Sequence, residues 1–480
     1  MNRQTKILII LFLIAFILRS VFLLSAPVKI WDETVYANMG YDLSNNPLDY
    51  SVANNGWSDF IPSGGDDFYA WPKMGFRAPL LPYSLSILYL FHLDFFVSFF
   101  MVFVGALSVC FVYLLGKRMF NSEIALYSAI LFLFLPLHVT YSAKILTGVL
   151  FTFFVILTLY SFWRGYEEGN KFHKVLFGIF LALALLSRYT ALWVMPVFLL
   201  YFLVRDRSLK FLKDKYLWYA IVSFFVVLVP WFIYGISEYN SPIGAFIHGA
   251  KASGYWGGFQ SWHFFFDYWF QMFALTGLVF LIAIIYILYK KEFFKRGIYF
   301  TLIFFFFFLI MAIYMPHKED RFILAITPAI AIISGYFLSK VKKYARLILV
   351  LAIIGSLILL SFQFTLTYKN SYTDKHKCFL EANEFLKNQE NALVITDESP
   401  IVYYYTKQET RFYSYPVSYS SLKEMVETSY AGKNSFVFFT DYDMPLTEEK
   451  NVKIKEDLDK NMENVFECSK TEGYSAVYKF

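Results

Sequence analysis

The residues best suited to chemistry are an acidic pair, Asp32 and Glu33, which closely follows an N-terminal apolar segment at 7–24. This spacing predicts two carboxylates in a loop at a membrane surface, where they can act as acid or base on a substrate carried by a lipid. The alternative is an acidic pair that is simply solvated. The remaining sequence favours the chemical interpretation.

The composition is that of a membrane protein. Hydrophobic residues make up 58% of the 480 residues and aromatic residues 22%, with 57 Phe and 37 Tyr, far above the usual content of soluble globular proteins. The formal net charge is +6, but the basic residues are spread over short loops between apolar runs and form no basic face. We therefore expect the lipid bilayer as a partner and no nucleic acid.

Apolar runs of about 17 to 25 residues are long enough to cross a bilayer. We predict about 11 such spans, at 6–24, 95–116, 123–140, 148–163, 174–187, 188–204, 216–235, 266–289, 298–315, 322–339 and 346–364. Arg19 interrupts the first, and Pro27 disfavours cleavage after Ala26, so we expect an uncleaved span rather than a secretory signal. A shorter run at 79–91 contains Pro79 and Pro82 and predicts a re-entrant or interfacial helix.

Most basic residues of this region lie in five loops, at 117–118, 164–174, 205–215, 290–296 and 340–346. The positive-inside rule makes all five cytoplasmic. The loop at 25–78, the region at 236–265 and the C-terminus then lie on the extracytoplasmic side of a cell membrane. We expect a multi-pass protein whose chemistry takes place on that side.

After Tyr368 the sequence becomes polar, which predicts a membrane domain at 1–367, including the outer loop, and a soluble domain at 368–480. Helices are expected near 378–387 and 422–428, and strands at 392–396, 411–415, 435–440 and 476–480, with an aromatic-rich stretch at 401–405. The predicted fold class is thus a polytopic α-helical membrane protein with a C-terminal soluble α/β domain. That domain has no Gly-rich phosphate loop, so we expect a supporting or acceptor-facing role. Cys378 and Cys468 share it and either pair or stay reduced, since spacing does not define their geometry.

Two groups of basic residues are candidates for holding a phosphate. Arg77 precedes the interfacial helix and is expected at headgroup height, where a guanidinium either binds a phosphate through paired hydrogen bonds or simply anchors the chain. The second group lies between two spans and consists of His317, Lys318, Glu319, Asp320 and Arg321. Consecutive ionisable residues beside a bilayer are costly unless they face a cavity, a ligand or, in the alternative, water in a short hairpin. Their cations suit a departing phosphate.

Five further residues are candidates for contact with the sugar or the lipid, namely Tyr36, Lys144, Tyr255, Trp256 and His263. The aromatic residues at 253–265 are explained equally well as ordinary interfacial aromatics. No cofactor is indicated and no residue is assigned to a metal. A divalent cation is compatible with the sequence but is not indicated by it.

At these positions the sequence resembles the glycosyltransferase C superfamily, whose polytopic enzymes use sugars carried on lipid phosphates. One span, then Trp31-Asp32-Glu33-Thr34-Val35-Tyr36, then Arg77-Ala78-Pro79-Leu80-Leu81-Pro82, resembles the protein O-mannosyltransferase and aminoarabinose-transferase branch. The run at 317–322 is similar to the H-K-E-x-R-F signature of the lumenal mannosyltransferases of GPI-anchor and N-glycan assembly. The resemblance covers about residues 1–340 and leaves the C-terminal part unexplained.

The resemblance implies an inverting transfer of a sugar, mannose-like, from a polyprenyl- or dolichyl-phosphate donor to an acceptor hydroxyl on a glycolipid or a protein. Asp32 is then the general base and Glu33 orients the acceptor. The phosphate is held by Arg77, Lys318 and Arg321, with His317 and Glu319 as further binding residues.

One departure from the O-mannosyltransferase branch is Gly148, because that branch often has a carboxylate at the start of the corresponding span. Its absence weakens the case for a protein hydroxyl as the acceptor. Two other functions remain open. A transporter or flippase for lipid-linked glycans would also need many spans, but it usually has internal repeats and charges at the midplane. A noncatalytic scaffold would tolerate changes of Asp32.

Overall fold

A computed structural model describes residues 2–25, 29, 31–52, 55–56, 74–255, 260–371, 373–413, 418–430, 432–442, 449–471 and 473–480. The chain forms two compact units. The helical unit comprises Met1–Leu24, Gly75–Leu81 and Asp94–Phe364, and the sheet unit comprises Ser25–Met74, Pro82–Leu93 and Thr365–Phe480. The described residues of 25–74 in the outer loop fall in the same unit as the C-terminal residues, and 75–78 fall in the helical unit.

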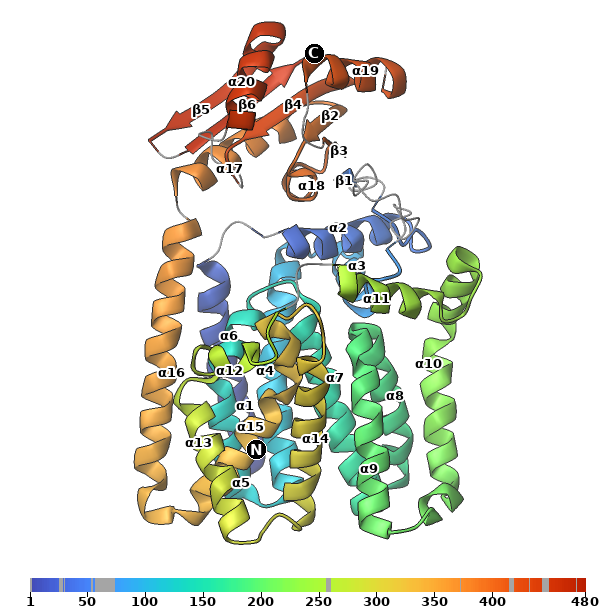
Figure 1. The fold of residues 1–480 in the computed structure, drawn as a ribbon, viewed down its shortest axis with the longest axis vertical. Helices are drawn as coiled ribbons and strands as arrows, with labels where there is room; N and C mark the ends of the chain where they lie inside the picture. The colour runs from blue at the N-terminus through green and yellow to red at the C-terminus, as the bar shows by residue number, and fades with distance from the viewer. Residues whose placement is uncertain are drawn as a thin grey trace. The chain divides into compact units, whose positions relative to one another are not determined.

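The helical unit is an α-helical membrane domain, as predicted (Figure 1). In the described part of the chain, nine helical segments are long and apolar enough to cross a bilayer. They are Arg3–Leu24 (α1), Asp94–Met119 (α4), Thr147–Glu167 (α7 and η3), Tyr189–Asp206 (η4 and α9), Lys215–Tyr239 (α10), Trp269–Tyr289 (α13), Arg296–Ile313 (α14), Asp320–Lys340 (η6 and α15) and Lys342–Lys369 (within α16, Lys342–Ser371).

Two of the about 11 predicted spans differ in the structure. The segment predicted at 123–140 is broken into Ser122–Leu133 (α5) and Pro136–Ser142 (α6), which meet at 59°, because proline cannot continue the hydrogen-bonded ladder of the preceding helix. The segment predicted at 174–187 is Lys171–Ser187 (α8), whose 17 residues reach about 25 Å. The short apolar run is the helix Leu80–Leu90 (α3).

The five basic loops of the helical unit gather at one end of its helices. Glu167 joins three of them, because its carboxylate pairs with Arg205 at 2.8 Å and with Arg296 at 3.0 Å. Arg118 pairs with the neighbouring Glu168 at 3.6 Å. In the last loop, the Lys340 ammonium lies 5.1 Å from the ring centre of Tyr336, whose hydroxyl accepts a hydrogen bond from Lys295. This shared end agrees with the alternation of spans that the positive-inside rule predicts.

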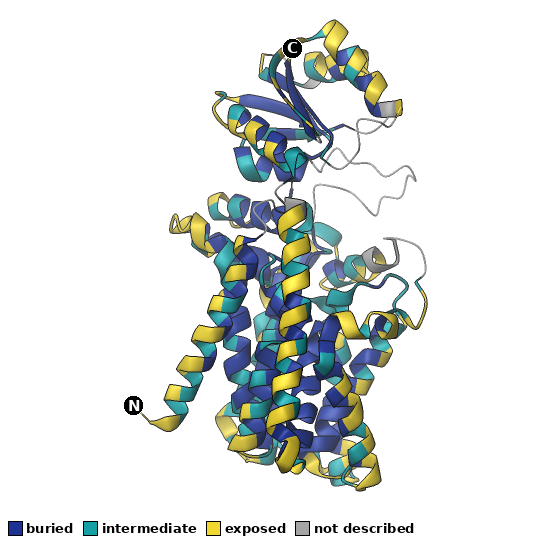
Figure 2. Cartoon of the chain, turned by 90° about the vertical axis from the view of Figure 1, so that its left-hand side faces the viewer, coloured by how far each residue is buried: buried dark blue, intermediate teal, exposed yellow. Residues whose placement is uncertain are grey.

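The outward faces of several helices are apolar. Only 28% of the apolar window of α10 and 17% of that of α16 is buried in the protein. Figure 2 shows the exposed residues of α16, the long helix that faces the viewer. The exposed large side chains of α16 are Tyr344, Leu347, Val350, Leu351, Ile354, Leu357, Ile358, Phe362, Leu366 and Tyr368. An apolar face of this length suits contact with lipid chains.

The sheet unit contains a six-stranded sheet in the order β1-β3-β2-β4-β6-β5. Its strands are Asn55–Gly56 (β1), Ala392–Thr396 (β2), Glu409–Phe412 (β3), Asn434–Thr440 (β4), Glu463–Lys470 (β5) and Gly473–Lys479 (β6). The first four neighbours pair in parallel, while β6 is antiparallel to both β4 and β5. Strand β1 comes from the outer loop, so one edge of the sheet is built by residues far from the others in sequence.

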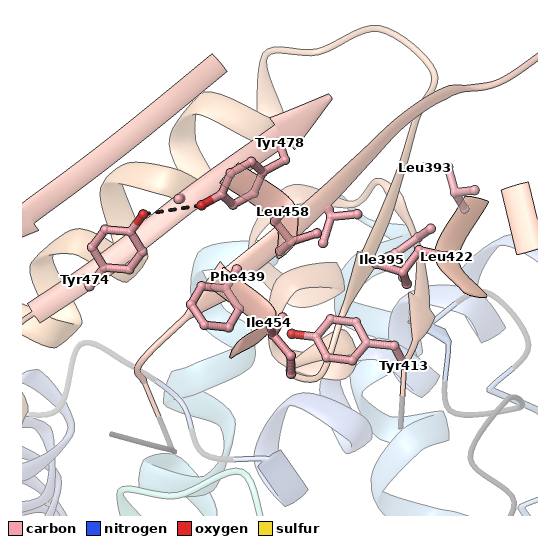
Figure 3. Packing of buried hydrophobic residues seen from close by; sticks show 11 residues of the cluster. Leu393, Ile395, Tyr413, Leu422, Phe439, Ile454, Leu458, Tyr474 and Tyr478 are labelled. Carbon is pink, nitrogen blue, oxygen red and sulfur yellow. Dashed lines mark hydrogen bonds between the residues drawn. The ribbon is translucent and has the colours of Figure 1, made fainter. Parts of the chain in front are cut away.

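Helices cover both faces of this sheet, and successive side chains of each strand point to opposite faces. Ala392 and Val394 face Asp374–Lys387 (α17) and Ser399–Thr406 (α18), whereas Leu393 and Ile395 face Tyr419–Ser429 (α19) and Glu449–Asn461 (α20). Figure 3 shows the second of these cores, in which the Tyr474 and Tyr478 hydroxyls lie 3.4 Å apart. The predicted α/β domain is therefore present, although α20 and β5 were not predicted and 401–405 belongs to a helix.

The three cysteines are all described. Cys378 on α17 and Cys468 on β5 form a disulfide, which settles the choice that their spacing left open. Cys110 is a buried thiol on α4.

Candidate functional site

The acidic pair lies on a helix and not in a loop. Trp31–Asn45 (α2) contains Asp32 and Glu33 in its first turn, where the helix dipole favours negative charge. Glu33 is buried, with 4% of its surface exposed, and Asp32 is half-buried. Our prediction of a loop missed this helix because α2 has little net hydrophobicity and buries polar residues such as Asn38.

The buried Glu33 carboxylate faces the C-terminal part of the sheet unit. Burial is the main reason why the pKa of Tyr405 on α18 is raised, and the nearby Glu33 carboxylate adds to the shift. The Tyr405 hydroxyl also accepts a hydrogen bond from the backbone N–H of Lys29 at 3.2 Å. Tyr36, a predicted contact residue, is buried in the same helix at 8% exposure.

The signature segment of the helical unit is organised around Glu319. The guanidinium of Arg321 contacts both carboxylate oxygens of Glu319, at 2.6 and 2.7 Å, and His317 Nε2 lies 3.1 Å from the same carboxylate. The next residue, Asp320, accepts hydrogen bonds from the Tyr141 hydroxyl and from the backbone N–H of Arg321. Glu319 thus orients Arg321 through a hydrogen bond from Nη2 and an ion-pair contact with Nε.

Lys318 has a different environment from the other residues of the segment. Its side chain is 4% exposed, and its ammonium donates to the backbone carbonyls of Gln260 at 2.9 Å and of Met315 at 2.6 Å. Burial lowers the pKa of this ammonium. Lys318 therefore joins the segment that begins at Gln260 to the turn before the signature, which makes it a less suitable phosphate ligand than Arg321.

Sequence reasoning missed Arg188 and Tyr189, which lie at the junction of α8 and η4. The Arg188 guanidinium stacks 4.3 Å from the ring of Phe322, in the signature segment. The Tyr189 hydroxyl donates to the carbonyl of Gly75 at 2.7 Å and lies 3.5 Å from that of Arg77. This junction connects Arg77 with the signature segment. The one sequence signal for it was a basic residue, Arg188, at the start of the predicted span 188–204.

Arg77, Arg188 and Arg321 lie at the end of the helical unit opposite the basic loops. The spans Tyr189–Asp206 and Asp320–Lys340 each begin beside this group and end in a basic loop. Arg77 is 8% exposed, and its guanidinium lies 5.5 Å from the ring of Phe76. Several guanidinium groups at one end of an apolar bundle provide the donors that a phosphate needs in a water-poor site.

The remaining predicted contact residues are only partly in this group. Lys144 stacks 5.0 Å from the ring of Tyr141, the residue that holds Asp320. His263 is exposed and directly precedes the short helix Phe264–Asp267 (α12). Its Nδ1 lies 2.5 Å from Asp267 Oδ2. Tyr255 ends the helix Gly244–Tyr255 (α11), and Trp256 lies outside the described residues. Within the described residues, no group of three His, Cys, Asp or Glu side chains could hold a metal ion.

Gly148 has a packing reason. It lies in the first turn of α7, and a Cβ atom there would be 2.6 Å from Leu324 Cδ1 and 3.8 Å from the carbonyl oxygen of Arg321. A larger residue at this position would require the Leu324 side chain to move. The close contact between α7 and η6 thus accounts for a glycine at 148 in place of the carboxylate.

The chain was compared with known proteins. Residues 77–234 match a family model described as dolichyl-phosphate-mannose-protein mannosyltransferase. Curated protein sequences include no match. Among solved structures, ArnT from Cupriavidus metallidurans in the apo state is similar over 100% of this chain and 98% of its own, with a TM-score of 0.73 and 13% identity. The chain has the glycosyltransferase C fold.

Two further structures share the glycosyltransferase C fold. ArnT bound to undecaprenyl phosphate is similar over 98% of this chain and 97% of its own, with a TM-score of 0.72 and 12% identity. The oligosaccharyltransferase AglB from Archaeoglobus fulgidus, in complex with an inhibitory peptide and a dolichol-phosphate, covers 98% of this chain and 74% of its own, with a TM-score of 0.60 and 15% identity. The likeness to ArnT includes the C-terminal part, which the sequence resemblance left unexplained.

Proposed function

We propose that this protein is an inverting glycosyltransferase of the cell membrane that transfers a sugar from a polyprenyl-phosphate donor to an acceptor hydroxyl on the extracytoplasmic side. The observation that carries the proposal is the end-to-end likeness to ArnT, which has been solved with undecaprenyl phosphate. The three guanidinium groups at one end of the helical unit support it. The family model matched by 77–234 favours a mannose-like sugar.

Two features support the extracytoplasmic side. The basic loops of the helical unit share the end opposite Arg188 and Arg321, and basic loops favour the cytoplasm. The disulfide of Cys378 and Cys468 is of a kind that persists in oxidising compartments. A donor on a lipid phosphate suits that side, where we expect no nucleotide sugars.

The proposed reaction is a single displacement. The acceptor oxygen forms a bond to the anomeric carbon while the bond from that carbon to the phosphate oxygen breaks, so the configuration inverts. The acceptor proton passes to the Asp32 carboxylate, and the electron pair leaves with the polyprenyl phosphate. Arg77, Arg188 and Arg321 stabilise the charge that develops on this phosphate. Glu33 is proposed to orient the acceptor, and Lys318 is now assigned to holding the loop.

The test is transfer from a synthetic polyprenyl-phosphate sugar by the purified full chain in detergent. Asp32→Asn removes proton acceptance with little change of shape, so we expect a loss of about 10²- to 10⁴-fold in rate. Glu33→Gln should have a smaller effect. Asp49→Asn is the matched control, because Asp49 is an exposed carboxylate of the same outer loop.

The outcome separates the proposal from its alternatives. If the wild-type protein transfers no sugar but moves a lipid-linked glycan across vesicles, it is a transporter. If Asp32→Asn retains full transfer, the assignment of the base is wrong. A noncatalytic scaffold predicts no product from any of these variants or from the wild type.

A further inference from the structure

Lys407 ends the helix α18 in an unusual backbone conformation. Its φ of 56° and ψ of 15° are left-handed, and its N–H donates to the carbonyl of Tyr403 at 2.9 Å. Glycine or asparagine is usual at such a helix end, because other side chains are strained there. Arg207 and Lys291 also have a positive φ, so what distinguishes Lys407 is the surroundings of its ammonium.

Those surroundings are four tyrosine rings. The Lys407 ammonium lies 4.5 Å from the ring centre of Tyr41, 5.1 Å from Tyr404, 5.6 Å from Tyr403 and 5.7 Å from Tyr89. All four distances are within the range of cation–π attraction. The rings come from α2, α3 and α18, which are far apart in the sequence and belong to the same unit. We call these five residues the lysine clasp.

Further contacts join α2 to α18 around the clasp. The Tyr403 hydroxyl donates to Asp42 Oδ1 at 2.6 Å, and burial together with that carboxylate raises the pKa of Tyr403, which keeps its proton in place. Asn38 Nδ2 donates to the carbonyl of Pro400 at 2.7 Å. The rings of Tyr41 and Tyr89 meet edge to face at 5.5 Å. The C-terminal half of α2 is therefore held on the C-terminal domain.

The acidic pair lies in the first turn of the same helix. Tyr41 is nine positions after Asp32, which is about 14 Å along a rigid α-helix. A rotation or a slide of α2 at the clasp therefore moves Asp32 and Glu33. A displacement of about 1 Å at a reacting group can cost about 10²-fold in rate.

We propose that Lys407 is a positioning residue for the acidic pair, and that the C-terminal domain sets the position of α2 through the lysine clasp. This inference rests on the proposed function, because it assigns Asp32 to the transfer reaction. It gives the C-terminal domain a defined role in that reaction.

The experiment compares three variants of the purified full chain. Lys407→Met keeps the length of the side chain but removes the charge, and we expect kcat to fall about 10- to 100-fold with little change in the KM for the lipid donor. Lys407→Arg keeps a cation that stacks on aromatic rings and should retain most of the activity. Lys423→Met is the matched control, since Lys423 lies 6.0 Å from the ring of Tyr419 but is 49% exposed.

Two readouts separate positioning from a general loss of structure. The double variant Asp32→Asn with Lys407→Met should lose less rate than the product of the two single losses, because part of the effect of the clasp acts through Asp32. Hydrogen exchange of the amides at 34–45 should accelerate in Lys407→Met and not in Lys423→Met. Full activity of Lys407→Met, or multiplicative losses in the double variant, would overturn the inference.

Hydrogen exchange also distinguishes the two proposals, because it needs no substrate. Faster exchange in α2 of Lys407→Met with no transfer by the wild type would refute the proposed function and the role in transfer, while the clasp itself would stand. If the wild type transfers sugar but hydrogen exchange in α2 is unchanged by Lys407→Met, the clasp alone is refuted.

Discussion

Replacing Arg19 by leucine should destabilise the helical unit, because this guanidinium satisfies the backbone where α5 and α6 meet. Arg19 lies on α1 with 0% of its surface exposed. It donates to Ser142 Oγ at 3.2 Å and to the carbonyls of Ala15 at 3.2 Å and Leu133 at 3.4 Å, and it lies 3.0 Å from His138 Nδ1. Leu133 is the last residue of α5, so its carbonyl has no partner further along that helix.

The expected magnitude follows from the groups that Arg19→Leu would leave behind. The carbonyl of Leu133 and Nδ1 of His138 each lose a partner inside the bundle, at about 1–3 kcal/mol per buried polar group. Removing a buried cation and adding apolar surface recovers part of this, roughly 1–2 kcal/mol. We expect the free energy of unfolding to fall by about 2–4 kcal/mol.

The assay is unfolding by denaturant in detergent micelles. Arg3→Leu is the matched control, because Arg3 lies on the same helix and is exposed. Gly105→Ala should disturb the same contacts by another route, since its Cβ would lie 2.4 Å from Ser142 Oγ and 3.1 Å from Arg19 Nε. If the free energy of unfolding of Arg19→Leu lies within about 0.5 kcal/mol of that of the control, these contacts do not stabilise the break between α5 and α6.

Three further predictions concern the site and its orientation. Arg321→Ala should lower kcat about 10²- to 10³-fold by removing a contact to the leaving phosphate, whereas Lys318→Met should mainly lower the melting temperature; equal kinetic losses in both would contradict the separate roles assigned here. Gly148→Ala should destabilise the fold by about 1–3 kcal/mol in chemical unfolding, because its Cβ would meet Leu324, and a neutral result would show that α7 can shift freely. A cysteine at Lys453 should react with an impermeant thiol reagent on intact cells, and one at Arg118 should not. Labelling of the cysteine at Arg118 would show that the predicted orientation is wrong.

The sequence alone determined the parts of this protein that depend on local composition. The length of apolar runs located most spans, since crossing a bilayer requires a continuous apolar helix. Proline marked the short helix α3 and, at Pro136, the break that we did not predict. Continuous short apolar runs located β2 and β4, because both faces of these strands are buried.

The tertiary structure decided which side chains work together. Arg188 stacks on Phe322, and Lys407 is surrounded by tyrosines from three helices. The ring of Phe322 and the rings of Tyr41 and Tyr89 are distant along the chain, so the local sequence does not indicate that they meet these cations. The environment of Lys318 was likewise invisible, since its hydrogen bonds go to backbone carbonyls that any residue type could supply.

The helix that carries the acidic pair shows the same division. The residue types of Asp32 and Glu33 indicated acid–base chemistry, and their place after the first span indicated a membrane surface. The sequence did not reveal that α2 is a helix or that it packs on α18, because α2 buries polar residues among its apolar ones and its hydrogen-bond partners Pro400 and Tyr403 lie more than 350 residues away. Polar burial is favourable only when specific partners are present, and those partners are brought together by the folded chain.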